Sequence, residues 1–281
     1  MSEIESLKDG KRPRVDVLNW KPRSWDQCIG NARLLRYLQD EAREVRGLID
    51  SGHSLANFSP RNILVSGPLR SGKTSQCKLF LRALTCAALD EHLNPCDGTC
   101  GPCSEKVDTV GQSGLFSVVT NGDGRPCIDV RQVDCGRVTP GEVKAIIDSI
   151  PFETNELMVV LWDEAHRLAA KQADEMLLKV AEERQCMFIL ATVAPEQLDP
   201  MLRGRFLNLK TELPTQEELA RFLLDRCREW DIGTDEFGLM SLLEKSKRLP
   251  GIALNALALA LALRQDLTSH FVENVWRPPW E

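Results

Sequence analysis

The run from residue 67 to residue 74, Gly-Pro-Leu-Arg-Ser-Gly-Lys-Thr, matches the phosphate-binding pattern GxxxxGK[ST]. A short apolar run of strand type, 62–66, precedes it, and residues 74–89 have the apolar spacing of a helix. A strand, a glycine-rich turn and a helix N-terminus together direct backbone N–H groups and the helix dipole at a polyanion. Lys73 would then reach the β- and γ-phosphates, and the Thr74 hydroxyl would ligate Mg²⁺. A chance match in a glycine turn is the alternative, and the strand and helix around the run argue against it. The candidate nucleotide-binding residues here are Gly67, Pro68, Leu69, Arg70, Ser71, Gly72, Lys73, Thr74 and Ser75.

Length and composition fit a globular protein with one large and one small domain. The chain has 281 residues, of which 43% are hydrophobic and 27% are charged. The N-terminus is polar and no apolar run is long enough to cross a bilayer, so we expect a cytoplasmic location and no membrane contact. Ten cysteines in such a chain indicate reduced thiols or metal ligation rather than disulfides.

The net charge of −6 gives no general attraction to nucleic acid, so any contact with DNA requires a local basic patch. The candidate patch is a basic N-terminal arm over residues 1–21 and the residues just after it. A solvated, flexible tail is the alternative, and it is the one that we favour. The basic side chains of this region are Lys8, Lys11, Arg12, Arg14, Lys21 and Arg23.

Strand-like runs alternate with helical patterns through most of the chain. This alternation predicts a mainly parallel sheet with helices on both faces, in an α/β nucleotide-binding domain over residues 22–212. The strand-like runs are 62–66, 128–134, 157–162, 187–192 and 206–209, and the main helical patterns are 31–50, 74–89, 141–149 and 172–183.

The composition changes after Pro214, where Thr215 and Glu218 form a capping-box pattern. Helical patterns follow at 215–229, 234–247 and 251–264. They predict a small all-helical domain over residues 213–265. The rest, 266–281, is expected to be a tail, because the pair Pro278-Pro279 cannot continue a helix.

Two carboxylates, Asp163 and Glu164, end the apolar run 157–162. If this run is the strand next to the P-loop strand, Asp163 would bind Mg²⁺ directly or through water. Glu164 would polarise a water for attack on the γ-phosphate. A solvated Asp-Glu turn is the alternative, since such strand ends are common, but the P-loop upstream favours the metal and base roles.

Three stretches resemble the clamp-loader AAA+ ATPases. Residues 22–31, Pro-Arg-Ser-Trp-Asp-Gln-Cys-Ile-Gly-Asn, resemble their opening box. Residues 163–183 resemble their Walker B end and the following helix, and Ile189 to Thr192 resembles their sensor 1 strand. Residues 22–265 are thus similar to the gamma/tau and delta-prime subunits of bacterial DNA polymerase III. The resemblance implies a P-loop AAA+ module with an all-helical lid domain and Mg-ATP bound between them, with Ile29 among the nucleotide-binding residues.

The resemblance also implies roles for two further residues. Thr192 falls at sensor 1, where a polar side chain helps to place the attacking water. Arg205 falls where the family keeps an arginine finger that acts on a neighbouring subunit's nucleotide, although Arg203 is a second candidate because the flanking Ser and Cys are replaced here. Two arginines on a surface loop are the alternative, and hydrolysis would then not depend on assembly.

Four cysteines, Cys86, Cys96, Cys100 and Cys103, surround a loop that is rich in proline and glycine. Turns let such sulfurs converge on a tetrahedral, structural Zn²⁺. Clamp-loader subunits carry a similar four-cysteine module after the P-loop helix, which supports zinc over four unrelated thiols. The other cysteines are expected to be small core residues, and His166 is expected at the surface or behind the site.

The chain departs from the family at three places. Leu254 stands where the family has an arginine that senses the γ-phosphate, so the coupling between nucleotide and lid is in doubt. Residues 266–281 are too few for the family's helical collar, and 104–126 are longer than its connector and could form a hairpin used by partners.

These observations predict an AAA+ ATPase that hydrolyses Mg-ATP at an interface in a homo- or hetero-oligomer and drives assembly or remodelling on DNA. One alternative is a nucleotide-binding scaffold subunit without turnover, like delta-prime. Another is a collar-less AAA+ partner of a different DNA-processing, transposition or defence system.

Overall fold

The structure is a computed structural model, and it describes residues 20–55, 58–104, 116–120, 126–150, 157–171, 173–183 and 186–280. Most of the basic N-terminal arm, residues 1–19, lies outside the described residues, as do 105–115 and 121–125 of the long connector.

A six-stranded sheet in the order β2-β3-β4-β5-β1-β6 forms the larger part of the molecule. The strands β3, β4, β5, β1 and β6 pair in parallel, which confirms the predicted parallel sheet. β2 pairs antiparallel with β3 as a hairpin. Because the five strands are parallel, the carboxyl ends of β1, β4 and β5 lie at one edge. The strands are β1 (Ile63–Ser66), β2 (Phe116–Thr120), β3 (Pro126–Asp134), β4 (Leu157–Asp163), β5 (Cys186–Thr192) and β6 (Leu207–Lys210).

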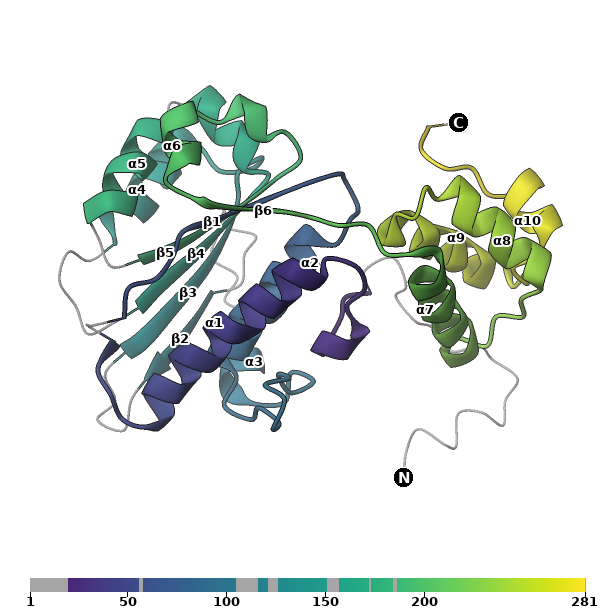
Figure 1. The fold of residues 1–281 in the computed structure, drawn as a ribbon, viewed down its shortest axis with the longest axis horizontal. Helices are drawn as coiled ribbons and strands as arrows, with labels where there is room; N and C mark the ends of the chain where they lie inside the picture. The colour runs from purple at the N-terminus through teal and green to yellow at the C-terminus, as the bar shows by residue number, and fades with distance from the viewer. Residues whose placement is uncertain are drawn as a thin grey trace.

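Helices cover both faces of the sheet, because the side chains of each buried strand alternate between the faces. In β4, Leu157, Val159 and Leu161 join one core, while Met158, Val160 and Trp162 join the other. Figure 1 shows α1 (Ala32–Asp50) and α2 (Lys73–Thr85) on the first face. On the second face lie α4 (Pro140–Asp148), α5 (Asp174–Glu183) and α6 (Pro200–Gly204).

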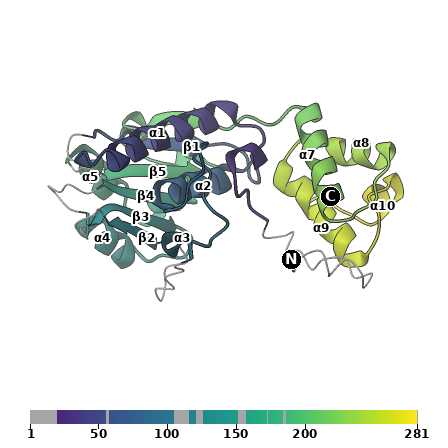
Figure 2. The ribbon, with the colours of Figure 1, turned by 90° about the horizontal axis from the view of Figure 1, so that it is seen from below.

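Four helices after β6 form a separate group beside the sheet (Figures 1 and 2). They are α7 (Gln216–Glu229), α8 (Glu236–Lys245), α9 (Pro250–Leu263) and α10 (Ser269–Asn274). The predicted capping box starts α7, since the Thr215 hydroxyl accepts from the Glu218 N–H at 3.1 Å. α10 falls in the expected tail, and Phe271, Val272 and Trp276 are buried in the core of the group. The positions of the domain boundaries stay predictions.

The helix after the P-loop is shorter than predicted. α2 ends at Thr85 rather than Leu89, because Cys86 has an extended backbone, with φ −64° and ψ 128°. This turn brings the Cys86 sulfur to the loop that follows. Short helices complete the described fold: α3 (Gly101–Ser104), η3 (Trp25–Gln27), η5 (Ala165–Lys171) and η6 (Pro195–Gln197). None of the helices in the described ranges has the length and apolar character that crossing a membrane requires.

Candidate functional site

The P-loop curls around the side chain of Lys73. Its ammonium group donates to the carbonyl oxygens of Gly67 and Pro68, at 2.9 Å and 2.8 Å. Gly67 has φ +147°, and a Cβ there would lie 1.8 Å from the Thr211 hydroxyl oxygen, so only glycine fits. Burial lowers the pKa of Lys73, and the nearby carboxylates of Glu164 and Asp163 oppose that shift. The loop therefore holds the Lys73 ammonium group beside two acids.

Thr74 and Asp163 meet at the start of α2. The Thr74 hydroxyl donates to the Asp163 Oδ1 at 2.8 Å. Two cis ligands of an octahedral Mg²⁺, each at its ideal distance, lie about 2.9 Å apart. These two oxygens therefore fit a magnesium ion that binds a nucleotide in the P-loop.

One part of the sequence prediction is wrong. The strand that carries Asp163 is not next to the P-loop strand, because β5 lies between β4 and β1. Asp163 still reaches Thr74, since α2 crosses the sheet and contacts β4 and β3 as well as β5.

Glu164, His166 and Thr192 form a chain of polar contacts beside the P-loop. His166 Nε2 lies 3.4 Å from Glu164 Oε2, and His166 Nδ1 lies 3.2 Å from Thr192 Oγ1. The buried Thr192 hydroxyl also accepts from the Ala194 N–H at 3.1 Å. One neutral tautomer satisfies all three groups: Nε2–H donates to Glu164, and Nδ1 accepts from Thr192. Glu164 has φ +55°, a strained conformation for this residue type that is found preferentially at functional sites.

Two cavities lie next to each other at the P-loop. One lies between the sheet and the helical group, and Ile29, Phe222 and Leu254 give it an apolar side. The other is lined by Lys73, Thr74, Asp163, Glu164 and Thr192, together with Leu69. Gly72 and Ser75 line both cavities, as do Lys21 and Arg70, whereas Ser71 lines the first. An apolar cleft beside a polar one suits a nucleotide base joined to its phosphates. Cys28 also lines the first cavity, and it is partly buried and packs against the first core.

The sequence did not point to Asn31, whose side chain is hydrogen-bonded to three segments at the P-loop. Its side-chain amide donates to the Ser71 carbonyl and to Gln76 Oε1, both at 3.0 Å, and its Oδ1 accepts from the Glu212 N–H at 2.7 Å. Asn31 is buried and has φ +56°, which asparagine tolerates better than most residues. The Gly-Asn pair at 30–31 is a turn signal that marks the position but not its three partners.

Arg205 lies away from both cavities. It lies two residues before the start of β6, which runs parallel to β1, so it is at the sheet edge opposite the P-loop. Its Nη2 lies 2.6 Å from Glu182 Oε1 of α5, and both side chains are partly exposed. Arg203, the second candidate, is only half-exposed, and its Nε is buried without a hydrogen-bond partner among the described residues.

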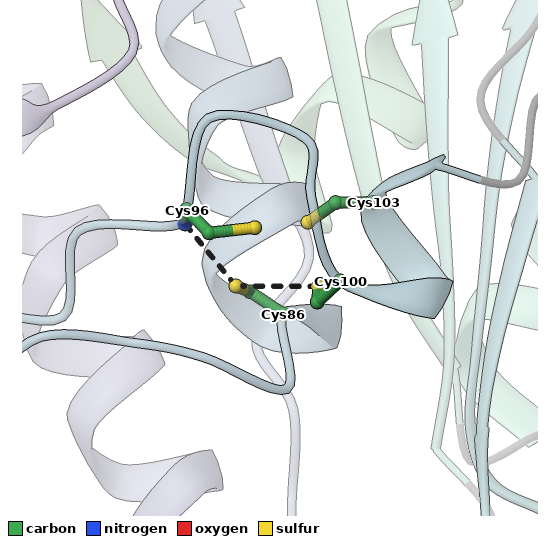
Figure 3. A group of neighbouring side chains, drawn as sticks. All are labelled: Cys86, Cys96, Cys100 and Cys103. Carbon is green, nitrogen blue, oxygen red and sulfur yellow. Dashed lines mark hydrogen bonds between the residues drawn. The ribbon is translucent and has the colours of Figure 1, made fainter. Parts of the chain in front are cut away.

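The four cysteines after α2 converge, as Figure 3 shows. The sulfurs of Cys86, Cys96, Cys100 and Cys103 all lie within 4.8 Å of one another, and those of Cys86 and Cys100 are 3.8 Å apart. Tetrahedral zinc–thiolate bonds place sulfurs about 3.8 Å apart, so the set fits Zn²⁺. Backbone N–H groups, that of Cys100 foremost, lower the pKa of the Cys96 thiol to about 5. Burial instead raises the pKa of the Cys86 and Cys103 thiols, so Cys96 is the thiol of the set that most readily supplies the thiolate that a metal requires.

Comparison with known proteins gives a consistent picture. The profile of the ATPase family associated with various cellular activities (AAA) matches residues 63–211. The DNA polymerase III subunit gamma of Buchnera aphidicola subsp. Schizaphis graminum is 26% identical over 252 residues, which cover 88% of this chain and 61% of that subunit. The tau subunit of Bacillus subtilis is 28% identical over 183 residues, 64% of this chain and 27% of that subunit. The chain thus spans less than two thirds of these relatives.

Among solved structures, the RuvB Holliday junction branch migration motor of Thermotoga maritima has the same fold. The TM-score is 0.55 at 18% identity, over 91% of this chain and 71% of that chain. At this identity the likeness extends to the fold alone.

Proposed function

The chain belongs to the AAA family of ATPases, and on that premise we propose that it binds Mg-ATP across the two neighbouring cavities and hydrolyses it where a neighbouring subunit completes the site. It is an AAA+ ATPase of the clamp-loader type, related to the gamma and tau subunits. The observation that carries the proposal is the 2.8 Å hydrogen bond from the Thr74 hydroxyl to Asp163, in the cavity that Lys73 and Glu164 also line.

Each of these residues has a distinct part in the proposed reaction. Lys73 neutralises charge on the β- and γ-phosphates after it leaves the P-loop carbonyls. Thr74 and Asp163 hold Mg²⁺, which would neutralise the charge that develops on the phosphate oxygens. Glu164 accepts a proton from the attacking water, and Thr192, through its hydroxyl, helps to place that water.

His166 has a positioning role in this proposal, because it is the described side chain that joins Glu164 to Thr192. His166→Ala removes one hydrogen bond to a charged group, which is worth about 1.5–3 kcal/mol, so we expect turnover to fall about 10- to 100-fold. ATP affinity should stay unchanged, since His166 lines neither cavity. The measurement is kcat together with the Kd of a fluorescent ATP analogue.

The conservative variant separates positioning from packing. His166→Gln keeps a donor that can reach Glu164, so it should recover part of the lost turnover. If His166→Ala hydrolyses ATP at the wild-type rate, or if both variants lose ATP affinity, the positioning role is wrong.

Arg205 is proposed to act on the nucleotide of the next subunit. The four residues of β1 place the two edges of the sheet about 10 Å apart, so Arg205 is poorly placed to reach its own P-loop. Its ion pair with Glu182 is at the surface, where such pairs contribute only about 0–1 kcal/mol, and an anionic phosphate can replace it. The proposal therefore requires an oligomer formed through the AAA+ modules.

A scaffold that binds nucleotide without turnover is the second candidate, and Leu254 favours it. α9 faces the first cavity with Leu254 and Asn255, and it contains no Lys, Arg or His from Pro250 to Leu263. The helical group as described thus supplies no cation from α9 to sense the phosphates.

Steady-state ATP hydrolysis across a protein concentration series, with and without primed DNA, decides between the two candidates. The ATPase proposal predicts turnover per chain that rises with concentration as the subunits assemble. Stimulation by DNA would favour remodelling on DNA. Tight nucleotide binding without turnover at any concentration would favour the scaffold.

We also propose a structural zinc ion at the cysteine cluster. Cys100→Ala removes one of four ligands, so we expect bound zinc to fall from about one per chain to near zero. The temperature of unfolding should fall with it, because the metal closes the loop that also carries Leu93 and Asn94, the hydrogen-bond partners of Trp25.

The matched control is Cys227→Ala, a buried cysteine of α7 outside the cluster. It should destabilise the chain while zinc stays bound. Elemental analysis of protein purified without chelators checks both variants, and wild-type protein with much less than one zinc per chain would remove the proposal.

A further inference from the structure

Arg70 joins the P-loop to α9 through its main chain. Its carbonyl oxygen accepts a hydrogen bond from the Gly251 N–H at 3.2 Å, across the gap between the sheet and the helical group. Arg70 has φ +64°, a left-handed conformation that costs about 1–3 kcal/mol for such a residue. The strained residue is thus the one that bonds to the first turn of α9.

The aliphatic part of the Arg70 side chain also packs against Gly251. A Cβ added to Gly251 would lie 3.1 Å from both Cβ and Cδ of Arg70, and 3.2 Å from its carbonyl oxygen. The side chain therefore occupies the space where a larger residue at 251 would stand.

The Arg70 guanidinium is free to bind an anion. Arg70 is exposed, and it makes no ion pair within the part of the chain that the structure describes. It lines both cavities, as Lys21 does, so a molecule that extends from one cavity into the other passes beside it. Arginine binds phosphate oxygens through two parallel N–H donors, which makes it well suited to this place.

We propose that Arg70 binds the phosphate chain of the nucleotide and couples its presence to the position of α9. The inference rests on the proposed function, because it places the nucleotide in the same two cavities. The charged end of the side chain contacts the phosphates, while its stem and carbonyl contact Gly251. Arg70 then supplies the positive charge at the phosphates that α9 does not supply, since α9 has no basic side chain from Pro250 to Leu263.

Binding of a fluorescent ATP analogue to a set of variants tests the phosphate contact. Arg70→Gln keeps the stem but removes the charge, and it should weaken binding about tenfold or more. Arg70→Lys keeps the charge but loses the paired donors, so a smaller loss of about threefold is expected. Arg23→Gln, an exposed arginine that lines neither cavity, is the matched control and should bind like the wild type.

Lys73→Ala separates this inference from the proposed function. If Lys73→Ala fails to bind but Arg70→Gln binds like Arg23→Gln, the role of Arg70 is wrong and the P-loop site stands. If Lys73→Ala binds like the wild type, the nucleotide is not in the P-loop and both proposals fail.

A double-mutant cycle tests the coupling to α9. Gly251→Ala places a methyl group against the Arg70 stem, so it should lower ATP affinity about threefold or more in the wild-type background. In an Arg70→Gly background the stem is absent while glycine keeps the left-handed backbone, so the added methyl meets only the carbonyl oxygen and the loss should be smaller. An equal loss in both backgrounds would overturn the coupling.

Discussion

Replacing Glu164 with glutamine is expected to slow ATP hydrolysis about 10²- to 10⁴-fold while ATP stays bound, because the amide cannot accept a proton from the attacking water. Glutamine has nearly the same size and can still accept from His166 Nε2, so the surrounding contacts should persist. The measurement is single-turnover hydrolysis of radiolabelled ATP with excess protein, alongside the Kd of a fluorescent ATP analogue.

The matched control is Glu175→Gln, an exposed glutamate on α5 that lines neither cavity. It should hydrolyse ATP like the wild type. Loss of ATP affinity in Glu164→Gln would instead place Glu164 in binding, and unchanged turnover would exclude it as the base.

Replacing Arg205 with alanine should lower turnover by about 10³-fold or more at concentrations where the subunits assemble, by analogy with arginine fingers that act on phosphoryl groups. The guanidinium is proposed to stabilise charge on the transferring phosphoryl group of the neighbouring subunit. ATP affinity of the isolated chain should not change, because Arg205 lines neither cavity.

Glu182→Gln tests the role of Arg205 by changing the glutamate with which it forms an ion pair. This change removes the ion pair at 2.6 Å and frees the guanidinium, so turnover should stay equal or rise. If Arg203→Ala rather than Arg205→Ala abolishes turnover, the finger has been assigned to the wrong arginine. If neither change matters, hydrolysis does not use a finger from this loop.

Much of the fold follows from local patterns in the sequence. The P-loop run, the apolar strands and the capping box at Thr215 each act over a few residues, so their spacing was enough to predict them. The apolar spacing predicts a longer helix after the P-loop, because it continues beyond Thr85, whereas the backbone turns away at Cys86 where the cysteine loop begins.

The arrangement of the site depends on contacts between distant residues, which spacing does not encode. β5 lies next to β4 in the sheet, and this pairing brings Thr192 beside His166. The hydrogen bond from Gly251 to Arg70 likewise joins residues that are far apart in sequence. A single sequence shows which residue types are present, but it does not show which of these distant residues contact one another.

Mixing two inactive variants tests the central claim most directly, that a neighbouring subunit completes the ATPase site. Glu164→Gln keeps the arginine but lacks the base, and Arg205→Ala keeps the base but lacks the arginine. In a mixture, the Arg205 side chain of the first variant can enter the intact site of the second. The account predicts that equal amounts of the two variants, each nearly inactive alone, recover a substantial part of wild-type turnover. A mixture no more active than its separate components, at a concentration where the wild type is assembled and active, would contradict it.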